Sequence, residues 1–245
     1  MTSHLLKQTQ CPSCAKIGND KSRNNLAIYS DGHEWCYRCG YYKGANGITK
    51  LVNSLQPIDN KGVYLPSDCD VSYPYKALQW VEQYELNRND LLSTHTLWSE
   101  EEQRLIFPVF GDRESLIAFQ GRWFGEGKAV KWYGKGNLKD TFNLLGRWQD
   151  KLVLVEDIIS AIKVSKVVGC MPLYGSHIDF HRWKRLKLLL NQGVRVIIWL
   201  DKDKQREAIK YRKQGSLLGL DVDVLITDLD PKEYSLDKIK ELLNG

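Results

Sequence analysis

The stretch Val194–Asp203, which reads VRVIIWLDKD, decides the fold. Val196–Leu200 is an unbroken apolar run between Gly193 and charged residues, which is typical of a strand buried on both faces of a sheet. Asp201 and Asp203 follow at the carboxyl end, where open α/β sheets carry their active sites. Carboxylates at this spacing point to one side, and they suit magnesium, which takes one or two carboxylates plus water and substrate phosphate. A solvated acidic turn explains Asp-x-Asp equally well on its own.

A second apolar run strengthens the case for a metal site. Leu152–Val155 ends in Glu156 and precedes a helical stretch, Ile158–Val168. Two buried strands that end in carboxylates bring acid to one edge of a sheet. Like charges there cost several kcal/mol unless a cation lies between them. The pattern therefore predicts a bound divalent cation.

The alternation of strands and helices continues from Lys151 onward. Such alternation favours a mostly parallel, right-handed wound sheet. The segment Thr227–Tyr234 follows the last strand and brings Asp228, Asp230 and Glu233 to the same edge. We expect strands at 152–155, 194–200 and 221–226 and helices at 158–168, 179–191, 204–218 and 235–243, with a short apolar segment at 169–174.

Four of the six cysteines form two Cys-x-x-Cys pairs separated by twenty-one residues. Four thiolates are the set that a closed, tetrahedral structural zinc site uses. The alternative is a redox pair, which two matched pairs in a short segment disfavour. We therefore predict a zinc ribbon over residues 8–45, with one Zn²⁺ held by Cys11, Cys14, Cys36 and Cys39.

Between these pairs, Leu26–Tyr29 and His33–Tyr37 flank Ser-Asp-Gly, which is a hairpin signal. Hydrogen-bonding and aromatic side chains on one small surface are how single-stranded bases are read. For Trp35 and Tyr37, a role in covering the zinc site explains the aromatic character equally well. The side chains that we expect to contact DNA here are Asp31, His33, Trp35 and Arg38.

The middle of the chain has a different character. Residues 46–70 have weak periodicity and turn-forming composition, so we expect a linker with a short helix around Ile48–Leu55. Ala77–Leu92 has helical spacing, and Arg104–Phe110 and Ser115–Trp123 indicate a hairpin of two strands.

A basic, glycine-rich segment follows that hairpin. Arg122 ends its second strand, and lysines then alternate with glycine, Trp132 and Tyr133. Such a segment suits a phosphate backbone or nucleotide phosphates, although a solvated loop would have the same composition. The lysines are Lys128, Lys131, Lys135 and Lys139.

Composition sets only broad limits. The 245 residues carry a formal net charge of +5, which is a mild hint of a polyanionic partner. No apolar run is long enough to span a bilayer and no secretory signal is visible, so we expect a soluble protein of the cytoplasm. Cys69 and Cys170 are isolated, and we interpret them as ordinary thiols, with Cys170 in the core.

Together these motifs resemble the bacterial-type DNA primases, and those of bacteriophages most of all. The resemblance covers nearly the whole chain. It implies a fold that is α/β (α+β overall), divided into a zinc ribbon (1–45), a linker (46–70), an N-terminal subdomain of the primase core (71–150) and a TOPRIM domain (151–245). The motifs on which the resemblance rests are Arg104-Leu-Ile-Phe-Pro, Gly121-Arg122, Lys131-Trp-Tyr, Glu156, Leu173-Tyr-Gly-Ser, Asp201-x-Asp203 and Asp230-Pro-Lys-Glu233.

The resemblance implies an enzyme that synthesises short RNA primers from ribonucleoside triphosphates on single-stranded DNA. Mg²⁺ or Mn²⁺ would be held by Glu156, Asp201 and Asp203, with Asp230 contributing. Arg122 and Lys131 would neutralise phosphate charge, Lys128 would contact DNA, and the ribbon would select the start site. Such a phage enzyme would act in the host cytoplasm.

Two departures from the family pattern stand out. Asp157 and Ser160 occupy the places where these primases carry glycine and a further acid after the first glutamate. No Gly-x-x-x-x-Gly-Lys-Ser/Thr loop is present, so a separate helicase, together with a DNA polymerase, is the implied partner.

Two alternatives remain open. A recombination mediator would combine a four-cysteine finger with a TOPRIM fold without catalysis, but it would lack the basic β region in between. A TOPRIM nuclease would use the same metals to cleave, and the ribbon with its hairpin argues against it.

Overall fold

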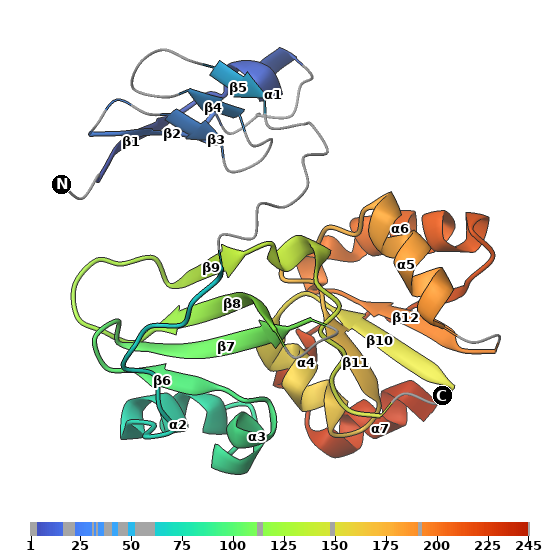
Figure 1. The fold of residues 1–245 in the computed structure, drawn as a ribbon. Helices are drawn as coiled ribbons and strands as arrows, with labels where there is room; N and C mark the ends of the chain where they lie inside the picture. Colours follow the sequence, from blue (N-terminus) through green and yellow to red (C-terminus); the bar gives the residue numbers. More distant parts are fainter. Residues whose placement is uncertain are drawn as a thin grey trace. The chain divides into compact units, whose positions relative to one another are not determined.

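The computed structural model describes residues 4–16, 23–30, 32, 34–36, 41–43, 49–51, 62–111, 115–147, 150–190 and 193–244. The chain forms two compact units, Met1–Asn60 and Lys61–Gly245 (Figure 1). The expected mixed α/β fold is confirmed. The finer division of the second unit at residue 150 stays a prediction.

The first unit is built on a five-stranded antiparallel sheet in the order β1-β2-β3-β4-β5. Its described core consists of Cys11, Cys14, Leu26 and Cys36. The expected hairpin is present as β2 and β3, but the helix expected around Ile48–Leu55 is wrong, because Thr49–Leu51 pairs with β4 as a strand. The elements are β1 (Leu5–Thr9), α1 (Pro12–Lys16), β2 (Leu26–Tyr29), β3 (Glu34–Cys36), β4 (Tyr41–Lys43) and β5 (Thr49–Leu51).

The second unit contains a parallel four-stranded sheet in the order β11-β10-β12-β13. The expected strands and helices of this half are all present, and the apolar segment at 169–174 contains a fourth strand. They are β10 (Lys151–Val155), α4 (Ile158–Ser165), β11 (Gly169–Pro172), α5 (Phe180–Leu189), β12 (Arg195–Trp199), α6 (Gln205–Leu217), β13 (Asp221–Val224) and α7 (Leu236–Asn244).

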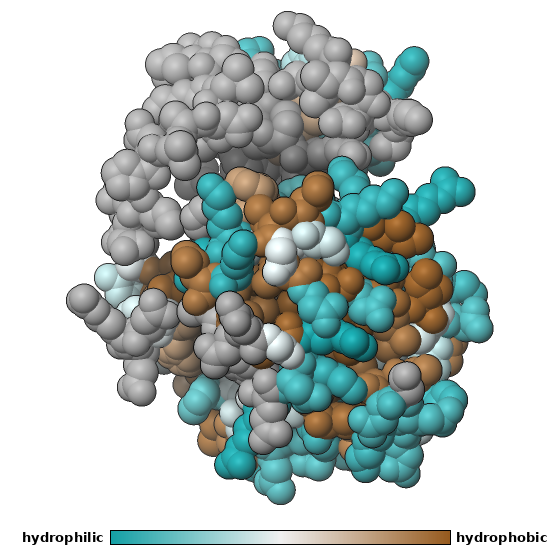
Figure 2. Space-filling model, turned by 90° about the vertical axis from the view of Figure 1, so that its right-hand side faces the viewer, coloured by the Kyte–Doolittle hydropathy of each residue, from teal (hydrophilic) through white to brown (hydrophobic). Residues whose placement is uncertain are grey.

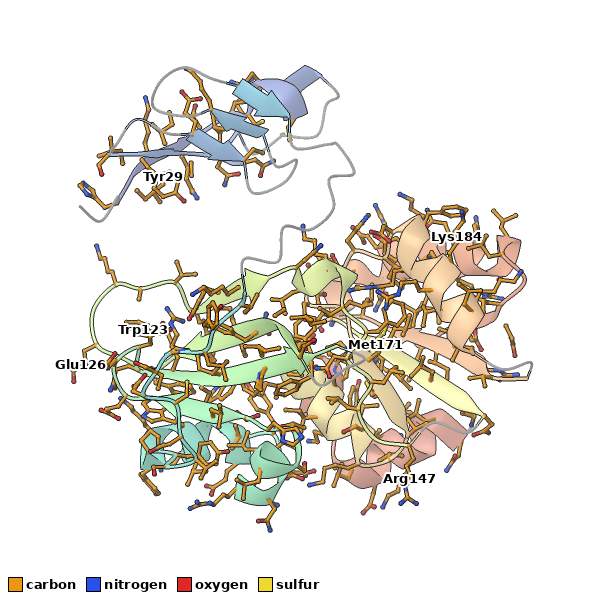
Figure 3. The ribbon with its side chains drawn as sticks, in the orientation of Figure 1. Tyr29, Trp123, Glu126, Arg147, Met171 and Lys184 are labelled. Carbon is orange, nitrogen blue, oxygen red and sulfur yellow. The ribbon has the colours of Figure 1, made fainter. Side chains whose placement is uncertain are left out.

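Both faces of this sheet are buried, which explains the unbroken apolar runs. Successive side chains of a strand point to opposite faces, so Leu152 and Leu154 pack on one side and Val153 and Val155 on the other. Helices α5 and α6 cover the first side through residues such as Trp183, and α4 and α7 cover the second (Figure 1). Met171 lies in this interior, whereas Lys184 lies on the outer side of α5 (Figure 3).

The part of the second unit that precedes β10 holds an antiparallel sheet in the order β6-β7-β8-β9. Trp132–Gly136 pairs with β8 as strand β9. This strand lies in the basic, glycine-rich segment, for which a solvated loop was the alternative interpretation. Buried residues of β7 pack with α2, α3 and α4 into one core. The elements are α2 (Tyr75–Glu82), α3 (Arg88–Ser93), β6 (Leu97–Ser99), β7 (Arg104–Phe110), β8 (Leu116–Trp123) and β9 (Trp132–Gly136).

The single helix expected over Ala77–Leu92 is wrong, because two helices occupy this range. Glu85 has φ of 56°, a left-handed conformation that ends a helix. Asn87 then starts α3 by accepting hydrogen bonds from two backbone N–H groups in a capping box. Helical periodicity survives such a break, so the pattern did not reveal it.

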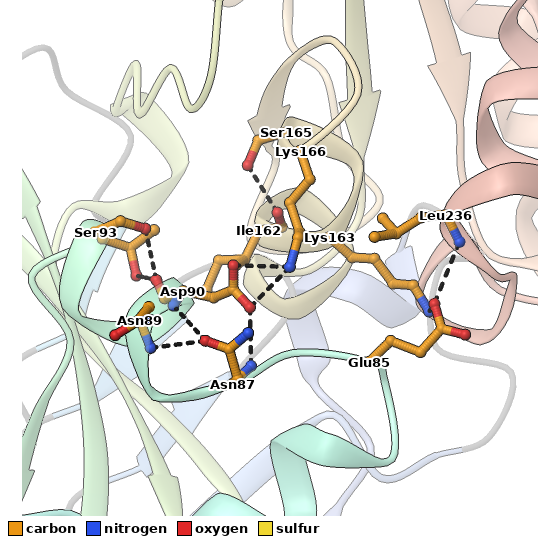
Figure 4. Close-up of polar contacts among 11 residues, drawn as sticks. Glu85, Asn87, Asn89, Asp90, Ser93, Ile162, Lys163, Ser165, Lys166 and Leu236 are labelled. Carbon is orange, nitrogen blue, oxygen red and sulfur yellow. Dashed lines mark hydrogen bonds and ion pairs between the residues drawn. The ribbon is translucent and has the colours of Figure 1, made fainter.

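The turn between α2 and α3 contacts α4 through charged side chains (Figure 4). Lys163 on α4 is buried and lies 3.4 Å from the Glu85 carboxylate, which also accepts a hydrogen bond from the backbone N–H of Leu236. Lys166 lies 2.9 Å from Asp90. These contacts fix α4, and therefore the turn before it, against the antiparallel part of the unit.

The outer faces of α5 and α6 combine charged and apolar side chains, which Figure 2 shows as teal and brown areas. Leu188 and Leu217 are almost fully exposed. No helix within the described residues has the length and apolar character needed to cross a bilayer.

Candidate active site

Two predicted acidic residues meet at the carboxyl edge of the parallel sheet. Val155 of β10 pairs directly with Trp199 of β12, so Glu156 and Asp201 follow neighbouring strands. Both line one cavity of about 340 Å³. Two of the predicted basic residues, Arg122 and Lys131, line the same cavity. One hollow thus joins groups from six separate segments: Arg122, Lys131, Glu156, Asp157, Asp201 and Lys232, with Trp80, Tyr84, Trp132 and Ile159.

Without a bound cation, the ionised forms of Glu156 and Asp201 are destabilised by burial and by their mutual repulsion. Burial raises the pKa of Asp201 to about 7; Lys232 opposes this shift, whereas Asp230 and Glu156 add to it. Burial also raises the pKa of Glu156. Glu156 Oε2 and Asp201 Oδ1 are buried and have no hydrogen-bond partner among the described residues. Orphaned carboxylate oxygens of this kind fit a hard divalent cation.

The other predicted metal ligands lie differently. Asp203 is part of a short 3₁₀ helix, its side chain is 72% exposed, and it pairs with Lys204 at 2.6 Å. Asp230 begins another 3₁₀ helix and lies 3.2 Å from Lys232. Neither residue lines the cavity. Among the described residues, ligand atoms of three or more His, Cys, Asp or Glu side chains come within 4.8 Å of one another only at the cysteines, so magnesium stays a prediction.

Asp157 and Ser160, the residues that depart from the primase pattern after the first glutamate, form a local structure of their own. Asp157 caps α4 by accepting hydrogen bonds from the N–H groups of Ile159 and Ser160 at 2.9 and 3.0 Å. The Ser160 hydroxyl donates to the other carboxylate oxygen at 2.8 Å. The Asp157 side chain therefore supports the start of α4, and it also pairs with Lys232.

The basic side of the cavity is dominated by Arg122. Its guanidinium lies over the rings of Trp80, Phe124 and Trp132, at 5.0, 5.1 and 5.7 Å from their centroids. It donates one hydrogen bond to the Trp123 carbonyl at 2.8 Å, and burial lowers its pKa. Aromatic faces stabilise a cation without neutralising it, so Arg122 keeps its charge for an anion in the cavity.

Lys128 and Arg104 lie outside this cavity. Lys128 is exposed in the loop before β9. Arg104 is buried over the Tyr133 ring at 4.5 Å and donates to the Val130 carbonyl at 2.9 Å. Together with Glu102 and Lys135 it lines a second, shallower hollow.

The first unit brings three predicted zinc ligands together. Cys11, Cys14 and Cys36 are buried, and their sulfurs lie within 4.8 Å of one another. The Cys14 N–H donates to the Cys11 sulfur at 3.5 Å, and the Cys14 and Cys36 sulfurs are 3.7 Å apart. Three converging thiols with an N–H···S contact fit a tetrahedral zinc site that takes a fourth ligand.

The remaining predictions for this unit fall outside the described residues. They concern the fourth zinc ligand, Cys39, and the proposed DNA contacts Asp31, His33, Arg38 and the side chain of Trp35. All of them stay predictions.

Sequence reasoning did not identify three residues of the cavity wall. Trp80 lies in α2 and Tyr84 in the turn that follows it, within a range for which the helical spacing predicts only a helix. Lys232 was noted only as part of an acidic motif. A lysine between an Asp-Pro pair and a glutamate was the available signal for it.

Solved structures of DNA primases share this fold. The primase fragment of the bacteriophage T7 primase-helicase protein has a TM-score of 0.54 and 16% identity, covering 98% of each chain. The Aquifex aeolicus primase, with its zinc-binding and RNA polymerase domains, has a TM-score of 0.57 and 16% identity over 98% of this chain and 80% of that one. The catalytic domain of DnaG primase bound to ssDNA has a TM-score of 0.55 and 13% identity, covering 71% of this chain and 73% of that one.

The likeness shows that this chain has a primase-like fold, in which the unit with the three converging cysteines precedes the unit that carries the cavity. The expected resemblance to bacterial-type primases is therefore confirmed for the fold. No family model and no curated protein matches the sequence.

Proposed function

We propose that the protein is a DNA primase, a nucleotidyltransferase that synthesises short RNA primers on single-stranded DNA. The observation that carries the proposal is the shared cavity of Glu156, Asp201, Arg122 and Lys131. Acidic and basic groups in one hollow match a substrate with a triphosphate and a divalent cation. The primase-like fold agrees with this chemistry.

Glu156 and Asp201 would hold Mg²⁺ or Mn²⁺. Asp203, two residues after Asp201, and Asp230, in the segment after the neighbouring strand β13, would complete the ligand set. When bound, the metal would lower the pKa of a ribonucleotide 3′-hydroxyl and neutralise charge on the incoming triphosphate. Ionised Glu156 and Asp201 are the ligand forms, so metal binding would oppose the upward pKa shifts that burial causes.

Arg122 and Lys131 would orient the triphosphate and stabilise negative charge on the departing pyrophosphate. Because Arg122 is packed against three aromatic rings, its fork of N–H donors is held before substrate arrives. Lys128 would contact the template backbone from the loop before β9.

The first unit would bind one Zn²⁺ and select the template start site through Asp31 and His33, supported by Trp35 and Arg38. A separate helicase would deliver single-stranded DNA, and a DNA polymerase would extend the primer, in the cytoplasm of the cell that the protein serves.

The proposal is tested with purified zinc-loaded protein, a random single-stranded template library and labelled ribonucleoside triphosphates. We expect short RNA products that depend on template and on Mg²⁺ or Mn²⁺. Binding of single-stranded DNA without any dinucleotide product would favour a recombination mediator. Cleavage of the template would favour a nuclease.

A further inference from the structure

Lys232 lies among carboxylates at the acidic edge of the parallel sheet. Its Nζ is 3.0 Å from Asp157 Oδ2 and 3.2 Å from Asp230 Oδ2. The side chain is 19% exposed and lines the cavity that contains Glu156 and Asp201. One ammonium group thus lies amid carboxylates from three turns of the sheet edge.

The loop around Lys232 is built to hold this position. Asp230 and Glu233 form a capping box, and Pro231 between them is buried. The buried ammonium of Lys163 donates to the Lys232 carbonyl at 3.2 Å, which ties the loop to α4. Asp157 in turn is oriented by the N-terminus of α4 and by Ser160. Both partners are therefore fixed before any ligand arrives.

We propose that Lys232 is a tethered cation that takes the place of one divalent ion at this acidic edge, so that the site binds a single Mg²⁺ or Mn²⁺ between Glu156 and Asp201. This inference rests on the metal site of the proposed function. The reason is charge and geometry. The Lys232 ammonium lies at hydrogen-bond distance from Asp157 and Asp230 and neutralises them, so these two carboxylates are not available as ligands for a second divalent ion. The orphaned oxygens of Glu156 and Asp201 remain for the first ion.

The same placement gives the metal-free protein a stable acidic edge. Loss of Lys232 would leave Asp157, Asp230 and Asp201 close together without their cation. When one partner of a half-buried ion pair is removed, the remaining charge still bears the cost of desolvation and repulsion but no longer has the attraction that offset it. Divalent ions would then become necessary for stability as well as for chemistry.

The test uses the full zinc-loaded chain in buffer free of other divalent ions. Mn²⁺ binding is measured by electron paramagnetic resonance, and thermal unfolding by tryptophan fluorescence, because seven of the eight tryptophans lie in the second unit. The variants are Lys232→Ala, Lys232→Arg, which keeps a cation, and the control Lys238→Ala, which removes an exposed lysine of α7 that pairs with Glu241.

We expect wild type, Lys232→Arg and Lys238→Ala to bind one Mn²⁺ per chain. Lys232→Ala should bind a second Mn²⁺, or bind the first at least roughly tenfold more tightly, because a repelling charge is gone. Without Mn²⁺ its melting temperature should fall by roughly 4–8 °C, and Mn²⁺ should restore it.

Unchanged stoichiometry, affinity and melting temperature in Lys232→Ala would overturn the inference. Should that variant not fold even with Mn²⁺, Lys232→Gln replaces it with the same expected changes, and equal Mn²⁺ binding by Lys232→Gln and Lys232→Arg would overturn the inference. Primer synthesis is assayed separately: a chain that shows these Mn²⁺ effects but makes no primers would contradict the proposed function and leave the role of Lys232 intact.

Discussion

Val155 and Trp199 are direct partners in the parallel pairing of β10 with β12. This register makes neighbours of two residues that are forty-five positions apart, Glu156 and Asp201, and both line the same cavity. This pairing places both carboxylates where one cation could bind them. A shift of one residue would turn the side chains of β12 to the opposite face of the sheet.

The pH dependence of stability should report on Asp201. The structure raises its pKa from 3.8 to about 7, so the folded state holds this proton more tightly than the unfolded state. Its stabilising effect is complete below 3.8 and is lost as pH rises through about 7. Zinc-loaded protein without Mg²⁺ should therefore melt at a lower temperature at about pH 8 than at about pH 6.

Asp201→Asn is the matched control for that experiment, because an amide does not titrate in this range. Its melting temperature should vary less between the two pH values than that of wild type. Equal slopes for the two proteins would show that Asp201 does not carry the effect.

Asp157 should stabilise the second unit chiefly as a helix cap. Asp157→Ala removes both backbone hydrogen bonds at the start of α4 and should lower the free energy of unfolding by about 1–2 kcal/mol. Asp157→Asn keeps a capping oxygen and should lose less. Urea denaturation measures both, and equal losses for the two variants would contradict the capping role.

Arg122 should require its shape as well as its charge. Arg122→Lys keeps a cation but loses the planar fork that packs on Trp80 and Trp132, so we expect roughly 10- to 100-fold less primer synthesis. Trp80→Ala should reduce activity in the same direction and Trp80→Phe less, with kcat affected more than the KM for nucleotide. Full activity of Arg122→Lys would refute the positioning argument.

Zinc should be bound by the first unit alone. Elemental analysis should find one zinc per chain in wild type, and Cys36→Ser should lower both the zinc content and the folding of that unit. Cys69→Ser is the control, because Cys69 belongs to the second unit and should not alter zinc. Zinc retained at full occupancy by Cys36→Ser would contradict the site.

His33 should affect which templates are used more than how fast they are used. His33→Ala should change the set of primed sequences in a random library, because base-edge contacts carry specificity. Sequencing of the products measures this. A uniform decrease over all templates would mean that His33 does not read bases.

The parallel half of the second unit was predictable from its sequence because both faces of its sheet are buried. That burial leaves long apolar runs such as Val196–Leu200, and the acids that follow them mark the sheet edge. The break between α2 and α3 was not predictable, since it depends on the left-handed conformation of Glu85. Strand β9 was hidden by its glycines, which weaken any strand signal.

The sequence predicts some residues of the candidate site but not the contacts that hold them in place. Glu156, Asp201, Arg122 and Lys131 are expected site residues that share a cavity, and their roles there stay predictions. The aromatic packing of Trp80 against Arg122 and the ion pairs of Lys232 arise from contacts between distant segments, and no local pattern encodes them. Asp203 followed its strand as expected, yet its exposed pairing with Lys204 depends on how the 3₁₀ helix turns.

The most direct test of the central claim is primer synthesis by Asp201→Asn and Glu156→Gln on single-stranded DNA with Mg²⁺. Each variant removes one charge and keeps its shape, and thermal unfolding confirms that it is folded. We expect template-dependent RNA products from wild type and a loss of at least roughly a hundredfold in both variants. Wild-type yields from either variant would show that the carboxylates at this sheet edge do not perform the chemistry.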